Sequence, residues 1–302
     1  MNNKVNCITF TSIIKVNGNV NGSWGEDIIS TIKKIRMPDS TMRTYISGQA
    51  LRRMSRSQFN SLGYTTSAKD PNVKNDKQPL STQCDPKKYI DDDLYGYMKT
   101  SGKSEKVFTR ISPVRVSPAI SLFPYYFERD LGLQNNNDIK KDNRFYETEI
   151  SMNYYVYTVL IEADRVGIFD DNSLNIEERK ERIKTVIKSF QYLWGGGHQS
   201  RLLADLSTKF IAYQSQKIKK PSFMDYVSMD EKLDIDSDLI QDAINQTGEI
   251  RNNLVIGISK SLNMDTGILK ESGNNVLTID EAFKKIYEDV DSMDIADINE
   301  RN

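Results

Sequence analysis

Cysteine and histidine are nearly absent from this chain, and so is any long hydrophobic run. The 302 residues include two cysteines, Cys7 and Cys84, and one histidine, His198. A structural zinc site needs more such ligands, so we expect no metal and no other cofactor, and two cysteines are too few for a disulfide framework. No apolar stretch approaches the roughly 20 residues that span a bilayer, and no signal-type segment opens the chain. The sequence therefore predicts a cytoplasmic protein with no membrane partner.

An excess of one charge is also missing overall, although not locally. The formal net charge is -1, from 41 basic and 42 acidic residues, which excludes a general polycation. From Lys33 to Asn60, however, seven basic residues stand against one acidic residue, Asp39. From Leu277 to the end, eight acidic residues stand against three basic ones. A nearly neutral protein with a basic N-terminal third can bind a polyanion through one surface.

Residue periodicity predicts an α+β fold. The β-branched run Val5–Val16 predicts a strand, as do Thr44–Ile46 and the tyrosine-rich region Phe145–Phe169. Residues Ile176–Trp194 repeat apolar side chains with the helical period, and Leu193 or Trp194 completes that stripe. Residues Leu202–Tyr213 predict a further strand. The order strand, helix, strands, helix, strand indicates an α+β or split β-α-β sandwich.

The first candidate binding element is the segment Tyr45–Arg56. Ser47 is a suitable N-cap for a helix that begins at Gly48 and Gln49, where free backbone N–H groups and the positive end of the dipole favour phosphate. Arginine side chains on the same helix add fork-shaped donors for phosphate oxygens. A capped, solvated surface helix is the alternative, and the local excess of positive charge favours binding. The arginines concerned are Arg52, Arg53 and Arg56.

The second candidate is the run Gly195, Gly196 and Gly197, followed by His198. Consecutive glycines let the backbone approach a ligand closely, and their N–H groups can form an anion-binding nest. The run lacks P-loop spacing and follows a helix, so it is weak support for an ATPase, and a flexible helix exit is the alternative. His198 is a candidate general base for RNA cleavage. It has no evident acid–base partner, which favours a surface or ligand contact.

Two acidic positions are candidate metal sites, but their settings favour structural roles. Asp39 follows a proline, which favours a turn or capping role. The run Asp91–Asp93 is typical of a cation cluster, yet Leu94 and Tyr95 follow it directly. We therefore expect a solvated turn that leads into a packed segment.

Several motifs occur in a fixed order along the chain. They are RTYISGQALRR from Arg43, DLYGYM from Asp93, PVRVSPAI from Pro113, YETE from Tyr146, DRVG from Asp164 and the three glycines from Gly195. Together they resemble the backbone subunit of type I CRISPR surveillance complexes (Cascade), in its DevR-like type I-B branch of the RAMP superfamily. The resemblance extends from about Val5 to about Tyr213.

This resemblance implies a modified RRM-like (ferredoxin-like) palm formed by residues 1–62 and 107–302. Residues 63–106 would be an inserted finger segment, and residues 123–146 would contain a thumb hairpin. The family implies a non-catalytic protein whose copies stack head to tail along one guide and present it for pairing with target DNA in antiviral defence. The implied partners are CRISPR RNA, target DNA through the guide, further copies of the chain, other Cascade subunits and a recruited helicase–nuclease.

The RNA-binding residues expected from the motifs lie mainly in the two candidate elements. Phosphate contacts without base-edge readout suit a protein that must accept any guide sequence. One alternative function is an RNA endonuclease of the same superfamily, which would process the CRISPR repeat through His198 or cleave target RNA through Asp39. Another is a general single-strand RNA chaperone. The expected RNA-binding residues are Arg43, Ser47, Gly48, Gln49, Arg52, Arg53, Arg56, Arg115, Gly195, Gly196, Gly197, His198, Gln199 and Arg201.

Overall fold

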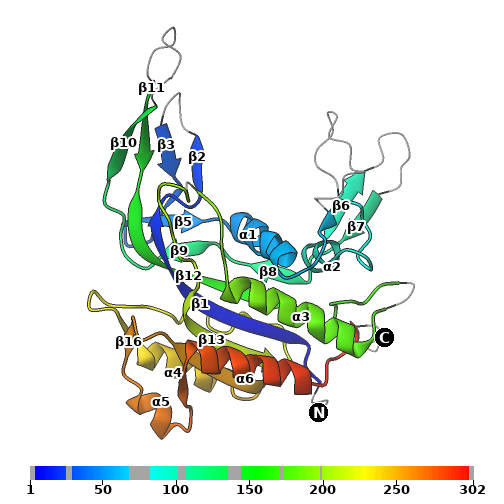
Figure 1. The fold of residues 1–302 in the computed structure, drawn as a ribbon. Helices are drawn as coiled ribbons and strands as arrows, with labels where there is room; N and C mark the ends of the chain where they lie inside the picture. The colour runs from blue at the N-terminus through cyan, green and yellow to red at the C-terminus, as the bar shows by residue number, and fades with distance from the viewer. Residues whose placement is uncertain are drawn as a thin grey trace.

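The computed structural model describes residues 4–24, 29–67, 82–100, 107–134, 144–170, 173–197 and 199–298. A nine-stranded sheet with helices forms the base of the molecule, and two smaller groups of strands project from it (Figure 1). The predicted α+β class is therefore confirmed. None of the helices that the structure describes combines the length and the apolar character needed to cross a bilayer.

The large sheet is built around β1, which pairs antiparallel with β12 on one side and β13 on the other. The chain runs from β1 through α1 to β8 and β9, returns along β12, and passes through α3 to β13. Both helical connections thus lie within one strand–helix–strand–strand–helix–strand series. The RRM-like description of this series stays a prediction. The strands are β1 (Cys7–Gly18), β4 (Lys34–Arg36), β5 (Met42–Ile46), β8 (Val114–Val116), β9 (Ala119–Ser121), β12 (Ser151–Ile161), β13 (Thr208–Gln216), β15 (Arg251–Ile258) and β17 (Val276–Thr278).

Both faces of this sheet are covered by helices and buried. Successive residues of a strand point to opposite faces, so neighbouring residues pack in different cores. In β13, Ile211 packs in the core beneath α1 (Gly48–Ser61), α3 (Ile176–Gln191) and α6 (Ile279–Ser292). Its neighbour Phe210 packs on the opposite side, with α4 (Ser237–Gln246) and α5 (Gly267–Glu271). The two cores explain why β1 is buried over nearly its whole length.

Capping residues set the starts of the two helices predicted from the sequence. The Ser47 side chain accepts a hydrogen bond from the Ala50 N–H, so α1 begins where predicted. Asn175 and Glu178 form a capping box at the start of α3, which ends at Gln191, earlier than predicted. The strand predicted over residues 202–213 begins only at residue 208.

Two projections rise from the base on either side of α1 (Figure 1). One is a four-stranded sheet in the order β10-β11-β3-β2, and the other contains the paired strands β6 and β7 beside α2. Strands β10 and β11 occur within or next to the expected thumb segment, and α2, β6 and β7 within or next to the expected finger segment, whereas β2 and β3 come from a part of the chain assigned to the palm. The division into domains stays a prediction. The elements are β2 (Gly22–Trp24), β3 (Ile29–Ile32), β10 (Arg129–Gln134), β11 (Arg144–Glu149), α2 (Ile90–Tyr95), β6 (Tyr97–Thr100) and β7 (Val107–Arg110), and a separate pair is β14 (Asp234–Ile235) with β16 (Asn263–Met264).

Candidate nucleic-acid interface

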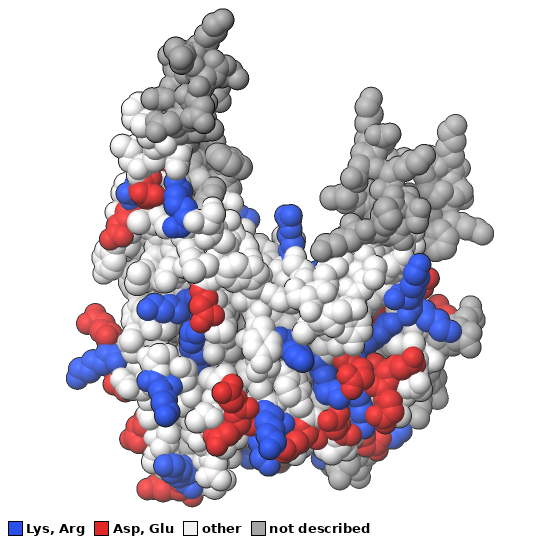
Figure 2. All heavy atoms as spheres, viewed as in Figure 1, with Lys and Arg blue, Asp and Glu red and all other residues white. Residues whose placement is uncertain are grey.

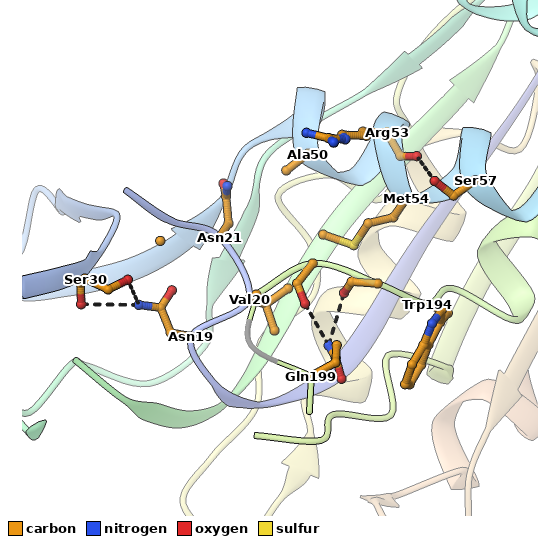
Figure 3. A pocket seen from close by; sticks show the side chains of 14 residues that line it. Asn19, Val20, Asn21, Ser30, Ala50, Arg53, Met54, Ser57, Trp194 and Gln199 are labelled. Carbon is orange, nitrogen blue, oxygen red and sulfur yellow. Dashed lines mark hydrogen bonds between the residues drawn. The ribbon is translucent and has the colours of Figure 1, made fainter. Parts of the chain in front are cut away.

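A cleft of about 630 Å³ opens where α1, the turn between β1 and β2, and the glycine run meet (Figure 3). It brings together the two binding elements that the sequence suggested separately. Figure 2 shows a basic side chain standing in the saddle between the two projections, whereas acidic and basic side chains are mixed over the base. The cleft is lined by Asn19, Val20, Asn21, Gly22, Ser30, Ala50, Arg53, Met54, Ser57, Trp194, Gly195, Gly196, Gly197 and Gln199.

The start of α1 is fixed by contacts on both sides. The Ser47 N–H donates to Asn21 Oδ1 at 2.9 Å, which ties the helix to the β1–β2 turn. Gly48 lies so close to β8 that a side chain there would collide with the carbonyl oxygen of Val116. Gln49, the next residue, is exposed. The first turn of α1 therefore presents its N–H groups from a rigid position.

The three arginines of α1 differ in their surroundings. Arg53 is exposed and lines the cleft, and its side chain makes no hydrogen bond or ion pair with the residues that the structure describes. Arg52 and Arg56 instead stack on the Tyr95 ring, at 5.0 and 5.5 Å from its centroid. The Arg52 guanidinium also donates to the Tyr95 carbonyl oxygen at 2.5 Å, and burial lowers the pKa of Arg52. Arg53 is thus the arginine of α1 best placed for a ligand in the cleft.

The acid run Asp91–Asp93, here called the acid triad, is fully buried in α2. The predicted solvated turn is therefore wrong. Asp93 accepts hydrogen bonds from Arg110 and, at 2.6 Å, from Arg182, as well as from the Gly167 N–H at 3.1 Å. These partners come from β7, α3 and the loop between β12 and α3, which no local sequence pattern connects to the triad. They supply the positive charge and the hydrogen bonds that make burial of carboxylates possible.

Another member of the triad holds Arg56. Asp91 Oδ2 lies 3.3 Å from Arg56 Nε, and Asp91 Oδ1 accepts a hydrogen bond from the Ser67 N–H at 2.9 Å. The triad thus ties α1 to the segment that enters the finger projection. Arg56 acts here as a structural cation, which its position on a basic helix did not indicate.

The glycine run, residues 195–197, lies directly on the β1–β2 turn. All three residues have positive φ, +117°, +77° and +59°, a region that favours glycine. A Cβ on Gly196 would come within 2.7 Å of the Val20 carbonyl oxygen, and one on Gly197 would collide with that of Asn19. Gln199 donates to the Gly195 and Gly196 carbonyl oxygens at 3.2 and 3.0 Å, so the run is a fixed part of the cleft and not a loose helix exit (Figure 3). His198 lies outside the described residues.

The remaining arginines expected to bind RNA all contact protein groups. Arg43 donates to the Ser121 and Leu122 carbonyl oxygens, and Arg201 donates to Thr148 Oγ1 at 2.8 Å. Arg115 donates to Glu162 Oε1 but keeps 59% of its side chain exposed. Arg115 also lines a second hollow of about 480 Å³, on the Arg52 side of α1. That hollow is lined by Gly48, Gln49, Arg52, Ile111, Ser112, Val114, Arg115 and Val116.

Asp39 has the turn role expected of it. Its Oδ1 accepts hydrogen bonds from the Thr41 N–H at 2.9 Å and from the Thr41 hydroxyl at 2.7 Å. These two bonds stabilise the carboxylate and lower the pKa of Asp39. Among the described residues, no three histidine, cysteine or acidic side chains form a group suited to a metal ion.

Comparison with known proteins decides the family. The sequence profile described as "CRISPR-associated negative auto-regulator DevR/Csa2" matches residues 19–228, well over half of the chain. The chain belongs to the DevR/Csa2 family. The resemblance inferred from the motifs is thereby confirmed, while the type I-B branch stays a prediction. Among curated protein sequences, none matches this one.

Two solved structures share the fold of this DevR/Csa2 protein. A chain from a "CRISPR RNA-guided surveillance complex" superposes with a TM-score of 0.61 at 12% identity, over 93% of this chain and 98% of that one. A chain from a "CRISPR RNA-guided surveillance complex, pre-nicking" gives 0.63 at 10% identity, over 94% and 100%. At such low identity the likeness concerns the fold alone.

Sequence reasoning missed one prominent residue of the cleft, Trp194. The sequence left open whether Leu193 or Trp194 completes the apolar stripe of the helix. Leu193 is buried, whereas Trp194 lies beyond the end of α3, lines the cleft and is 47% exposed. An exposed indole beside such a cleft can stack on a nucleic-acid base. Its position immediately before Gly195 was the available signal. A helix that ends before the glycines leaves Trp194 outside the helix, so its side chain need not follow the apolar face.

Proposed function

We propose that this DevR/Csa2 protein is a non-catalytic subunit that binds CRISPR RNA, oligomerises head to tail along the guide and presents the guide for pairing with target DNA. The observation that carries the proposal is the cleft, in which α1 and the glycine run face one shared space. Each of these elements suits phosphate for a different reason, α1 through the exposed Arg53 and the glycine run through closely approachable backbone. The N-terminus of α1, at Gly48 and Gln49, lines the second hollow instead and adds a further phosphate-binding element there.

The chemistry of the cleft favours a nucleic-acid strand of any sequence. Backbone N–H groups and the Arg53 guanidinium recognise phosphate, which is the same at every nucleotide. Stacking on Trp194 tolerates all four bases, because every base has a π-face. The second hollow continues this surface past the start of α1 to Arg115. A strand that crosses the start of α1 would contact both hollows.

The β10–β11 projection supports the part of the proposal that concerns assembly. Leu131, Leu133 and Phe145 are 65%, 48% and 58% exposed. Leu133 pairs directly with Phe145, and Leu131 pairs with Glu147, so all three apolar side chains share one face of the hairpin. An apolar row on a projecting hairpin favours a covering surface, and the next copy along the RNA would supply one. Such heterologous contacts, when they do not close, form a helical filament.

The remaining parts of the proposal follow from the family. The filament would act in the cytoplasm with other Cascade subunits, and a separate helicase–nuclease would be recruited to cut the target. The role of Asp39 in a turn gives no support to target cleavage through that residue. The subunit itself would contribute binding and geometry, not a catalytic group.

The experiment that tests this proposal is purification of the protein co-expressed with a CRISPR array and its partner subunits. We expect a discrete guide-length RNA, which limited nuclease treatment cuts at regular intervals. Protein without RNA, under conditions in which the partner subunits assemble, would contradict the proposal. Uncut labelled repeat RNA and uncut guide-paired target RNA are also expected, and cleavage that is lost in His198→Ala or Asp39→Ala would instead identify an endonuclease.

A further inference from the structure

We propose that Arg201 is a positioning residue that couples the β10–β11 hairpin to the glycine run, and that it does not hold RNA phosphate. Arg201 was expected from the motifs to bind RNA, but its contacts in the folded protein indicate a different role. The consequence for RNA spacing rests on the proposed function of the cleft. The coupling itself is a property of the protein without RNA and has its own test.

The Arg201 guanidinium contacts both strands of the hairpin. On β11, its Nη2 donates to Thr148 Oγ1 at 2.8 Å, and its central carbon lies 4.7 Å from the centre of the Tyr146 ring. On β10, its Nη1 lies 3.7 Å from Asp130 Oδ2. Hydrogen bonding, stacking and charge thus act on one planar group, which is the geometry that arginine satisfies and lysine does not.

The Tyr146 ring also packs against β10. Gly132 pairs directly with Tyr146, and a side chain at Gly132 would collide with the tyrosine ring. The ring therefore occupies the space that a side chain at Gly132 would need, and it also contacts Arg201. This packing holds the ring that the guanidinium contacts, so that the position of Arg201 and the orientation of the hairpin depend on each other.

At its other end, Arg201 belongs to the segment that forms the cleft. Gln199, two residues earlier, binds the Gly195 and Gly196 carbonyl oxygens through Nε2 and accepts the Ala204 N–H at 3.0 Å through Oε1. The hydrogen bonds of the Gln199 side chain connect residues before Arg201 (Gly195 and Gly196) with a residue after it (Ala204), so Arg201 lies in a short segment whose two ends are fixed. A displacement of the hairpin is thereby transmitted through Arg201 to the glycine run.

The hairpin also reaches the cleft along its backbone. Thr148 pairs in parallel with Ser30 of β3, and Ser30 lines the cleft beside Asn19. The hydroxyl that receives the Arg201 hydrogen bond therefore belongs to a residue already linked to the opposite side of the cleft. Arg201 closes a ring of contacts around the cleft, and a phosphate contact would require it to leave these partners.

The first test measures the hairpin in the full chain without RNA, by hydrogen exchange of the backbone amides in β10 and β11. For Arg201→Ala and for Arg201→Lys we expect roughly tenfold faster exchange, because each loses the fork and the stack. Thr148→Val should give a smaller increase in the same amides. In the double variant the two effects should be less than additive, since both changes remove one shared contact.

Arg129→Ala is the matched control, because Arg129 is on the same hairpin and, among the described residues, its side chain pairs with Glu147 and stacks on Phe127, and does not pair with the glycine run. Its effect on exchange should be small, as for other exposed ion pairs. Wild-type exchange in Arg201→Lys would overturn the proposal, because charge alone would then be sufficient. So would unchanged exchange in Arg201→Ala.

The second test adds RNA. Arg201→Ala and Arg201→Lys should keep the salt dependence of RNA binding, while the regular spacing of nuclease cuts becomes irregular. The salt slope is the change in the logarithm of the RNA-binding constant with the logarithm of the salt concentration. If its magnitude falls by about 0.7 in Arg201→Ala and is restored in Arg201→Lys, Arg201 contacts a phosphate and the proposal is overturned. If the wild-type protein binds no RNA, the proposed function fails, but the exchange results still decide whether Arg201 positions the hairpin.

Discussion

The two flanks of α1 carry the same type of residue and use it differently. Facing the cleft, Arg53 is exposed and has no side-chain partner among the described residues. Facing α2, Arg52 and Arg56 stack on Tyr95, and Arg56 also pairs with Asp91. Three arginines within five positions of one helix thus have different roles: one is free to contact a ligand, and two stabilise the fold. The number of basic residues in a sequence therefore exceeds the number that are available to bind a polyanion.

The difference between the flanks has a simple physical origin. The acid triad is buried, and each buried carboxylate requires compensating charge or hydrogen bonds. Arg56 is therefore held by Asp91 before any ligand arrives, and Arg52 is held by the neighbouring Tyr95. The cleft side contains backbone groups and amides instead of acids, so Arg53 keeps its charge for an incoming anion.

The largest expected effect comes from breaking the acid triad at Asp93. Asp93→Asn should lower the free energy of unfolding by about 3 to 5 kcal/mol, because it leaves the largely buried Arg110 and Arg182 side chains without their counter-charge. Urea denaturation of the two proteins measures this difference. The matched control is Glu147→Gln, which removes an exposed partner of Arg129 and should cost less than about 1 kcal/mol. Equal losses of unfolding free energy in the two variants would show that the buried ion pairs of Asp93 contribute no more to stability than an ion pair at the surface.

A smaller effect, on binding, should separate the arginines of the two flanks. Arg53→Ala should weaken RNA binding roughly tenfold for every sequence and reduce the salt slope by about 0.7, the value for one phosphate contact on a single strand. Arg52→Ala and Arg56→Ala should leave the slope unchanged and lower stability instead. RNA titrations at several salt concentrations, with unfolding curves for each variant, test both statements.

The control for charge is Lys260→Ala, which removes an exposed cation from the turn after β15 and should change neither affinity nor slope. An equal loss of slope in all three arginine variants would contradict the comparison. It would mean that Arg52 and Arg56 leave Tyr95 and Asp91 to reach the RNA.

Local chemistry made part of this architecture predictable. Ser47 and Gly48 indicate where α1 begins, because a cap and a close backbone approach depend on adjacent residues. The glycine run likewise predicts backbone that few other residues adopt. The strand Val5–Val16 was recognised from its composition, and the sheet that buries it on both faces explains that composition.

The partners of charged residues could not be predicted, because they come from distant segments. Arg182 reaches Asp93 across 89 positions of the sequence, and Arg201 reaches Thr148 across 53. Burial of the triad depends on three elements that meet only in the folded chain. The residue types in the cleft were thus predictable, whereas the division of arginines between ligand and fold was not.

The smallest expected effect concerns Asp92, the member of the triad without an arginine partner among the described residues. Its carboxylate accepts the Asp85 N–H at 3.0 Å, and burial raises the pKa of Asp92 above its ordinary 3.8. Because the folded pKa is the higher one, folding favours the protonated acid, and this contribution to stability is lost as the pH rises through the folded pKa. Asparagine has no such dependence. Asp92→Asn should therefore gain stability relative to wild type as the pH rises above about 4, the ordinary pKa of an aspartic acid, by less than Asp93→Asn loses. Unfolding curves of both proteins from this pH upward measure the difference, and a difference that does not vary with pH would show that Asp92 is as well compensated as Asp93.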